Sequence, residues 1–394
     1  MDRKVLGLIV TAAGDSLLGT LGATDVALTP FAGKFRFIDF ALATLVNSGV
    51  SDIYVFAPEP VLDIERHLAR AGHVLGSRMT VIPLPAPRAA SGRLPRLLDA
   101  LALAHPLVRA HHSESVVLLS AEHILLADLR QLFDVHDGGN ADATLAAFPV
   151  FSDDAFQRPL LRVDATDRVR KVDAYPGDGV GFSADTLAWA GDLVVRSAFV
   201  PDLLEARAAG DEAALLGTLC AAARLSAYNV LENRVPGRPG GLSAYWHEPA
   251  TVEEYYRAQM ELCTSRPALD LYNPAWPLAA ANTGLAPAKV VTDSAGRAGQ
   301  ALDALMSDGS VIQGGVVIKS VLGHGVRVES GAEVEDSILL DGCRIGPGAR
   351  VRRAVVGAGA VIGEGESIGY GEALPAHASL RHSGLTLVPP AAAR

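Results

Sequence analysis

Two apolar segments of the chain end in residues that could do chemistry. Residues 5–10 form an uninterrupted apolar run that small residues follow at once, a pattern typical of a strand buried on both faces and ending in a loop. The loop after such a strand is where α/β proteins usually hold phosphates. Residues 115–120 form a second apolar run, and Glu122 and His123 follow it at the strand's carboxyl end. For His123, catalysis and a structural hydrogen bond both stay open.

The cysteines and the N-terminal residues bear on the compartment. The three cysteines are odd in number and far apart, without a paired metal spacing such as CxxC: Cys220, Cys263 and Cys343. Reduced thiols in a cytoplasm are the plain interpretation. Arg3 and Lys4 precede the first apolar run and give it some likeness to a signal peptide. The run is short and acidic residues flank it, so we expect a strand and a cytoplasmic protein.

Length and composition limit the classes of protein to consider. A chain of 394 residues with 49% hydrophobic content can supply the cores of two or more domains. The formal charge of -10 argues against a general nucleic-acid binder or a protein of anionic membranes, because such partners need a basic surface. No run approaches the roughly 20 apolar residues of a membrane span. Any anionic ligand must therefore be held locally.

The elements that must position these residues alternate between strand and helix patterns. After residues 5–10, the expected strands are 53–57, 79–84, 115–120, 143–150, 160–164, 169–173 and 187–195. The expected helices begin near residue 37 and continue at 61–71, 94–107, 129–137, 199–208, 212–223 and 252–262. This alternation predicts a doubly wound, mixed but mostly parallel sheet in an α/β domain over residues 1–262, followed by a linker over 263–290.

The last third of the chain has a different period. Apolar residues recur every six positions with two slips of one residue: Val316, Leu322, Val328, Val334, Leu340, Ile345, Val351, Val356, Ile362 and Ile368. One apolar residue per hexapeptide is the signature of a parallel β-helix, although a glycine-rich run of hairpins is an alternative. We predict a left-handed β-helix domain over residues 291–372 and a tail over 373–394. Such solenoids commonly support assembly, so we expect a homo- or hetero-oligomer.

Four stretches resemble one known family. The segment PFAGKFRFIDFALATLVNSGV (30–50) is similar to the segment after the nucleotide loop of glucose-1-phosphate adenylyltransferases, the ADP-glucose pyrophosphorylases of glycogen synthesis. LYNPAWPL (271–278), PAKVVTDSAGRAGQALDALMSDGSVIQGGVVIKSVLG (287–323) and the Arg352-Arg353 region resemble the family's linker and β-helix. The resemblance covers nearly the whole chain. It implies a nucleotidyltransferase (GT-A-like) sheet domain before the β-helix.

The nucleotide loop departs from the family's pattern. The family joins glucose 1-phosphate to the adenylyl group of ATP with a loop Gly-Gly-Arg-Gly-x-Arg-Leu and a later Lys-Pro. Aligned without gaps, Ala13 and Ser16 stand at the two arginine positions, Val26 at the lysine position, and Asp15 adds a negative charge. Losing one charge clamp on a transferring phosphoryl group commonly costs about 100-fold in rate. Three losses predict little catalysis.

The resemblance also identifies metal and sugar positions that have changed. The two family aspartates that hold Mg²⁺ correspond to Glu122 and Glu248, which keep the charge but lengthen the side chain, so they are weak metal candidates. Mg²⁺ would be the cofactor of an active chain. Asp173 falls in the segment matching the family's Glu-Lys-Pro, and Trp189 replaces a serine of the sugar site. Two interpretations of Trp189 stay open: it fills that site, or it stacks on another ligand.

Four cations match the region where the family binds phosphorylated effectors: Lys34, Arg36, Arg352 and Arg353. They are candidate ligands for an anionic metabolite, and ordinary surface residues are the alternative. An intact scaffold with an emptied site is similar to the family's regulatory subunits, such as the bacterial D-type subunit that pairs with a catalytic subunit. Three hypotheses follow: a catalytically impaired regulatory subunit, an active nucleotidyltransferase making ADP-glucose or another nucleotide sugar, and a stand-alone sensor of sugar phosphates or nucleotides.

Overall fold

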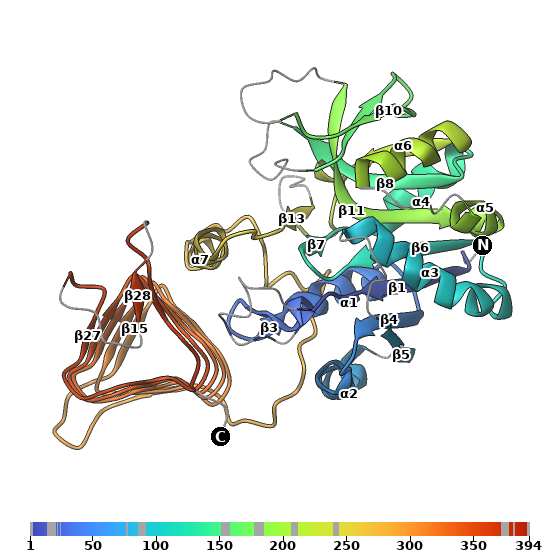
Figure 1. The fold of residues 1–394 in the computed structure, drawn as a ribbon. Helices are drawn as coiled ribbons and strands as arrows, with labels where there is room; N and C mark the ends of the chain where they lie inside the picture. The colour runs from blue at the N-terminus through green and yellow to red at the C-terminus, as the bar shows by residue number, and fades with distance from the viewer. Residues whose placement is uncertain are drawn as a thin grey trace. The chain divides into compact units, whose positions relative to one another are not determined.

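A computed structural model describes residues 3–13, 21, 23, 25–75, 78–85, 92–150, 158–176, 185–205, 212–238, 244–371, 378–380 and 383–391. The chain forms two compact units (Figure 1). The α/β unit comprises Met1–Ala12, Ile38–Glu248 and Leu271–Ala279. The β-helix unit comprises Ala13–Phe37, Pro249–Asp270 and Ala280–Arg394. The division predicted from the sequence, 1–262, 263–290, 291–372 and 373–394, stays a prediction.

A nine-stranded mixed sheet organises the α/β unit, with the order β10-β9-β11-β6-β1-β4-β5 and with β8 and β12 joined through β11. Its parallel part is formed by β1 (Val5–Val10), β4 (Asp52–Pro58), β5 (Arg78–Leu84) and β6 (Ser115–Ser120). The remaining strands are β8 (Ala143–Pro149), β9 (Leu160–Val163), β10 (Val169–Asp173), β11 (Thr186–Arg196) and β12 (Leu225–Asn229). Because β11 runs antiparallel to β6, β8 and β9, the sheet changes direction beside β6.

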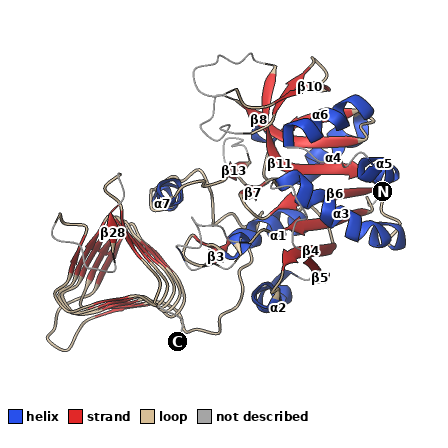
Figure 2. Cartoon of the chain, viewed as in Figure 1, coloured by secondary structure: helices blue, strands red, loops and turns tan. Residues whose placement is uncertain are grey.

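Helices flank this sheet (Figure 2). They are α1 (Phe37–Asn47), α2 (Leu62–Leu75), α3 (Arg93–Ala110), α4 (Leu129–Gly138), α5 (Val200–Glu205) and α6 (Glu212–Ala222), with short 3-10 turns η4 (Ser197–Phe199) and η5 (Val230–Glu232). Leu94, Leu97 and Leu101 of α3 are fully buried in the core that also contains side chains of β1 and β6. This packing fixes α3 against β1 and β6.

The sequence predicted most of these elements. The strands expected at 5–10, 115–120 and 169–173 are confirmed. The helix expected over 94–107 runs from Arg93 to Ala110 and includes Pro106, because its buried apolar stripe continues past the proline. The helix expected over 199–208 is described only as Val200–Glu205, since residues 206–211 lie outside the described part. Among the described helices, none is long and apolar enough to cross a membrane.

The β-helix unit is built on three sheets that form the sides of a triangle (Figure 1), and all of their strands pair in parallel except β28 with β29. The first side is β14 (Lys289–Val291), β17 (Val311–Gln313), β20 (Arg327–Val328), β23 (Arg344–Ile345) and β26 (Val361–Ile362). The second is β15 (Gln300–Leu302), β18 (Val316–Ile318), β21 (Glu333–Glu335), β24 (Arg350–Arg352) and β27 (Ser367–Ile368). The third is β16 (Leu305–Met306), β19 (Val321–Leu322), β22 (Ile338–Leu339), β25 (Ala354–Val356), β29 (Thr386–Val388) and β28 (Ser379–Leu380). The predicted hexapeptide β-helix is thus confirmed.

The repeat is shorter than a strict hexapeptide. Leu322 stacks on Leu339, 17 positions later, and Leu339 stacks on Val356 in the same way. In a coil of 17 residues, one of the three steps therefore spans five residues. This corrects two of the predicted inward positions, since the interior cluster contains Val317 and Leu339 in place of Val316 and Leu340.

Residues from earlier in the chain complete the β-helix unit. They form η2 (Val26–Leu28), β2 (Pro30–Phe31), β3 (Phe35–Arg36) and α7 (Val252–Glu261). A capping box in which Thr251 and Glu254 exchange side-chain and backbone hydrogen bonds begins α7. The Tyr255 hydroxyl donates to the Pro30 carbonyl at 2.6 Å, and Ala32 N donates to Gln259 at 2.9 Å. The segment from Pro30 to Arg36 is therefore held by α7.

Candidate functional site

A two-stranded antiparallel ribbon brings the two predicted metal carboxylates together. It pairs β7 (Ile124–Leu126) with β13 (Tyr245–His247), and His247 lies opposite Ile124. Glu122 lies two residues before this ribbon on one strand, and Glu248 immediately follows it on the other. Residues that are far apart in the sequence thus reach the carboxyl end of β6.

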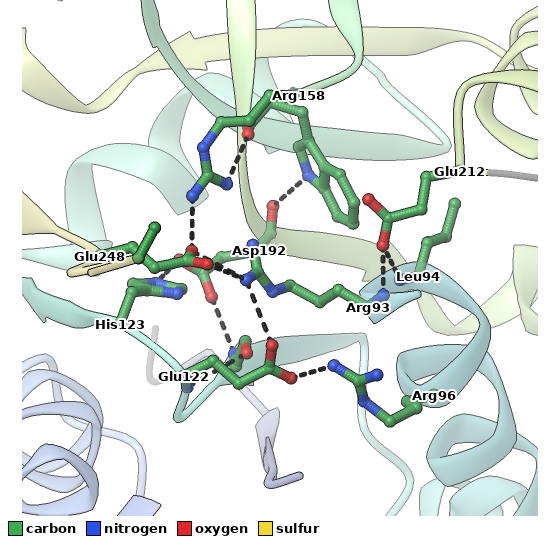
Figure 3. Close-up of polar contacts among 12 residues, drawn as sticks. Arg93, Leu94, Arg96, Glu122, His123, Arg158, Asp192, Glu212 and Glu248 are labelled. Atoms are coloured by element: carbon green, nitrogen blue, oxygen red, sulfur yellow. Dashed lines mark hydrogen bonds and ion pairs between the residues drawn. The ribbon is translucent and has the colours of Figure 1, made fainter. Parts of the chain in front are cut away.

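Three arginines surround these carboxylates (Figure 3). Arg93 Nη2 donates to both oxygens of Glu248 at 2.8 Å and lies 3.3 Å from Glu122 Oε2. Arg96 donates to Glu122 Oε1, and Arg158 Nη2 donates to Glu248 Oε2 at 2.5 Å. We call Arg93, Arg96, Arg158, Glu122 and Glu248 the arginine–glutamate network.

The surrounding fold supports the position of Arg93. Glu212 accepts hydrogen bonds from the backbone N–H groups of Arg93 and Leu94 and so caps α3. Gly191 has a φ of +104°, and a Cβ there would lie 2.6 Å from Arg93 Nη1. A glycine is therefore needed for both the backbone conformation and the path of this arginine. On the other side, the Arg158 guanidinium lies over the Trp246 ring at 4.6 Å.

The network is mostly buried, and its charges stabilise one another. The Arg93 side chain is 10% exposed and that of Glu248 is 21% exposed. Burial opposes the charge on Glu248, yet Arg93 and Arg158 outweigh it and hold the pKa of this carboxyl well below its usual range. Burial likewise opposes the charge on Glu122, and Arg93 and Arg96 lower its pKa. Burial also opposes the charge on Arg93, but Glu248 and Glu122 raise the pKa of its guanidinium. Glu248, Glu122 and Arg93 are therefore all held in their charged forms.

His123 belongs to a second, more deeply buried contact. Its Nε2 lies 2.8 Å from Asp192 Oδ2, and both side chains are at most 1% exposed. Asp192 Oδ1 accepts a hydrogen bond from Ser120 N at 2.9 Å, and the Asp192 carbonyl accepts one from Trp189 Nε1 at 3.2 Å. These contacts support the structural interpretation of His123.

Comparison with known proteins identifies the chain's relatives. Residues 25–177 match the family model for nucleotidyl transferases, and residues 286–388 match the model for the GlmU-like C-terminal hexapeptide region. The chain is 30% identical to the glucose-1-phosphate adenylyltransferase of Deinococcus radiodurans over 90% of each chain. It is 31% identical to the enzyme of that name from Frankia casuarinae, over 90% of this chain and 89% of the relative. For that of Paramagnetospirillum magneticum the identity is 30%, over 98% of this chain and 93% of the relative.

The chain belongs to the glucose-1-phosphate adenylyltransferase family. Membership in this family makes Mg²⁺ the implied metal, with Glu122 and Glu248 as its candidate ligands. Mg²⁺ requires near-octahedral oxygen coordination at about 2.0–2.1 Å. All four carboxylate oxygens of the two glutamates already accept from arginine. A divalent cation there would also face three guanidinium groups, so these residues do not fit Mg²⁺. Among the described residues, no group of three or more His, Cys, Asp or Glu is placed to hold a metal.

The two residues at the family's sugar-site positions, Trp189 and Asp173, are engaged in contacts within this protein. Trp189 is 1% exposed and lies in the hydrophobic core of the α/β unit. Asp173 Oδ1 lies 2.6 Å from Lys171 Nζ, and its Oδ2 lies 3.3 Å from Arg162 Nε. The hydrogen bond from Lys171 lowers the pKa of the Asp173 carboxyl. Because the Trp189 indole is buried, the structure favours the interpretation that it fills the former sugar site over the interpretation that it stacks on a ligand.

The positions that match the nucleotide loop carry no cation where the structure describes them. Ala13 forms an isolated antiparallel bridge with Asp25. Val26 is 8% exposed and begins η2, which Asp25 caps by accepting from Ala27 N at 2.8 Å. Ser16 and Asp15 lie outside the described residues. Ala13 and Val26 therefore contribute backbone structure and apolar packing.

Each of the four candidate effector ligands has a partner within the β-helix unit. Lys34 Nζ lies 3.8 Å from Asp308, and Arg36 Nη2 lies 2.5 Å from Asp341. Arg352 Nε lies 3.5 Å from Glu335. Arg353 Nη2 donates to the Ser383 carbonyl at 3.2 Å. The four partners named here differ from one another, and the role of the four cations in binding an anion stays a prediction.

The sequence interpretation missed the three arginines of the network. Arg93 and Arg96 do carry a signal, because cations in the first turn of a helix oppose its dipole, and α3 begins at Arg93. A local rule broken in this way often marks a functional or strained position. Arg158 carries no such signal. Only the tertiary structure shows that it reaches Glu248.

Proposed function

We propose that this chain is a catalytically impaired regulatory subunit that modulates a catalytic glucose-1-phosphate adenylyltransferase in the synthesis of glycogen or another α-glucan. One observation carries the proposal: the two carboxylates that correspond to the family's metal ligands are both saturated by buried arginines. Transfer of an adenylyl group needs cations around the triphosphate and metal-bound carboxylates to neutralise developing charge. In this site three guanidinium groups already neutralise the two carboxylates.

The changes outside the metal position support the same proposal. Trp189 fills its position with a buried indole, and Asp173 is paired with Lys171 and Arg162. Val26 is buried where the family has a lysine. The scaffold of the family is retained, while the groups that would contact ATP and glucose 1-phosphate are replaced or engaged. A retained scaffold suits a role that depends on association and conformation.

The deciding experiment measures pyrophosphate release from ATP and glucose 1-phosphate with Mg²⁺. Three samples are compared: the chain alone, a catalytic paralogue alone, and the two mixed. The paralogue comes from the same cell and has the Gly-Gly-Arg-Gly-x-Arg loop. We expect no turnover by the chain alone, co-purification with the paralogue, and altered maximal rate, substrate affinity or response to phosphorylated metabolites in the mixture.

The other outcomes assign the remaining functions. Robust turnover by the chain alone would overturn the proposal in favour of an active nucleotidyltransferase. Unchanged kinetics of the paralogue together with no co-purification would favour a stand-alone sensor. A genome that lacks a second copy with the intact loop would remove the partner that the proposal requires.

A further inference from the structure

A single nitrogen atom joins the two carboxylates of the arginine–glutamate network. Arg93 Nη2 lies 2.8 Å from each oxygen of Glu248 and 3.3 Å from Glu122 Oε2. We propose that the Arg93 guanidinium takes the structural place of a divalent cation between Glu122 and Glu248, and that its removal creates a divalent-cation site. This inference goes beyond the proposed function, because it concerns the charge balance of this site and not a partner.

Within the described part of the chain, two of the four carboxylate oxygens in the network are contacted by Arg93 alone. Glu122 Oε1 is held by Arg96, and Glu248 Oε2 is held by Arg158 as well as by Arg93. Glu122 Oε2 and Glu248 Oε1 have contacts only from Arg93 among the described residues. Without that side chain, two carboxylates would present free oxygens to the position of one cation. Arg96 and Arg158 would still balance the total charge, but only at the outer oxygens, so the two facing inner oxygens would repel each other and favour a small cation between them.

The fold is built around this arginine. Glu212 fixes the backbone at the start of α3, and Gly191 leaves the space that the Arg93 side chain crosses. Arg96 and Arg158 hold the outer oxygens through contacts that do not involve residue 93. The carboxylates are therefore positioned by contacts that do not include Arg93. Such pre-positioned carboxylates are suited to bind Mn²⁺ or Mg²⁺ once the competing charge is gone.

The test uses the full chain with Arg93→Met, which removes the charge and keeps an unbranched side chain. Binding is measured by electron paramagnetic resonance of Mn²⁺, and stability by denaturant unfolding followed through tryptophan fluorescence with EDTA or Mn²⁺. All three tryptophans, Trp189, Trp246 and Trp276, belong to the α/β unit, so the signal reports that unit. We expect one bound Mn²⁺ per chain and, at about 100 times its dissociation constant, a roughly 100-fold gain in the folding equilibrium.

Two matched variants show whether the charge at residue 93 is decisive. Arg93→Lys keeps a cation and should neither bind Mn²⁺ nor gain stability from it. Arg93→Met combined with Glu248→Gln removes one carboxylate and should lose the Mn²⁺ response of the single variant. An Arg93→Met chain that folds only with Mn²⁺ would support the proposal as strongly as one that folds in EDTA and binds the ion.

The proposal is overturned if Arg93→Met folds without binding Mn²⁺, or if Arg93→Lys responds to Mn²⁺ as Arg93→Met does. A measurement on the unaltered chain tests it even where Arg93→Met does not fold. Glu122→Gln should remove no Mn²⁺ binding from the unaltered chain. If the unaltered chain binds Mn²⁺ and Glu122→Gln abolishes that binding, the proposal is overturned. These readouts are binding and folding, so they are independent of whether the chain modulates a catalytic partner.

Discussion

Arginine–glutamate ion pairs occur in the α/β unit and on the β-helix, and the two groups of pairs differ in their exposure to solvent. In the α/β unit, Arg93 is 10% exposed and lies 2.8 Å from Glu248, which is 21% exposed. On the outer face of the β-helix, Arg350 is 46% exposed and lies 3.7 Å from Glu333, which is 59% exposed. Arg352 and Glu335 repeat the second arrangement on the same pair of strands.

The difference shows that burial, and not the type of residue, decides what such a pair does. A buried charge cannot lose its partner to water, so removing one member leaves an uncompensated charge that costs several kcal/mol. An exposed pair exchanges its partner for water and ions at little cost. The buried network can therefore exclude a metal ion, while the pairs on the β-helix contribute mainly to a soluble surface.

The largest expected effect comes from breaking the buried network. Glu248→Gln leaves Arg93 and Arg158 without a full counter-charge, and we expect a loss of about 3–5 kcal/mol in the free energy of unfolding. Tryptophan fluorescence in denaturant measures this loss in the α/β unit. A loss below about 1 kcal/mol would show that the site is solvated and that the comparison of the two regions fails.

The second effect tests whether apolar packing stabilises the β-helix. Ile345 is fully buried in its interior, and Ile345→Ala should cost about 2–5 kcal/mol because it removes buried methyl groups and leaves a cavity. Far-UV circular dichroism reports both units, and tryptophan fluorescence reports the α/β unit, so a change seen only by circular dichroism is assigned to the β-helix unit, which has no tryptophan. The matched control is Val361→Ala on the same sheet, where the side chain is 60% exposed and little change is expected. Equal losses at the two positions would contradict the interior assignment.

A third prediction concerns a buried titratable group without a carboxylate partner. His136 is 1% exposed and its Nδ1 lies 2.9 Å from Thr144 Oγ1. Burial and the charge of Arg196 lower its pKa to about 4, so the unfolded chain binds the proton more readily between pH 4 and about 6.5. Stability from this group is therefore complete above about pH 6.5 and is lost as the pH falls towards 4, by at most about 3 kcal/mol.

His136→Asn tests this prediction, because it can keep the contact to Thr144 without the imidazole. Between pH 6.5 and 4 the variant should lose less stability than the unaltered chain. The exposed change His112→Asn is the control for removing an imidazole elsewhere. Unfolding is measured at each pH by tryptophan fluorescence, and parallel pH profiles for His136→Asn and the unaltered chain would contradict the assignment.

The smallest effect is expected on the β-helix surface. Glu333→Gln makes the same chemical change as Glu248→Gln but at an exposed pair, so the loss should stay within about 1 kcal/mol. Added salt should reduce even this difference, because exposed charges are screened. Unfolding followed by circular dichroism at low and high salt measures it. A loss near that of Glu248→Gln would mean that burial does not separate the two regions.

The sequence by itself determined the elements whose signals are local. Buried strands such as β1 and β6 follow from uninterrupted apolar runs, and the β-helix follows from the spacing of Val328, Val334 and Val351. A comparison of residue types also indicated that Ala13 and Val26 lack the charge of the nucleotide loop. These inferences need only periodicity and the chemistry of one position at a time.

The tertiary structure alone decided which charges meet. Arg93, Arg158 and Glu248 come from separate segments, and only the pairing of β7 with β13 and the packing of α3 bring them together. It also decided that Val317 faces the β-helix interior in place of Val316, because a five-residue step shifts the register. Ion pairing and register depend on distances across the fold, and the spacing of residues along the chain does not specify those distances.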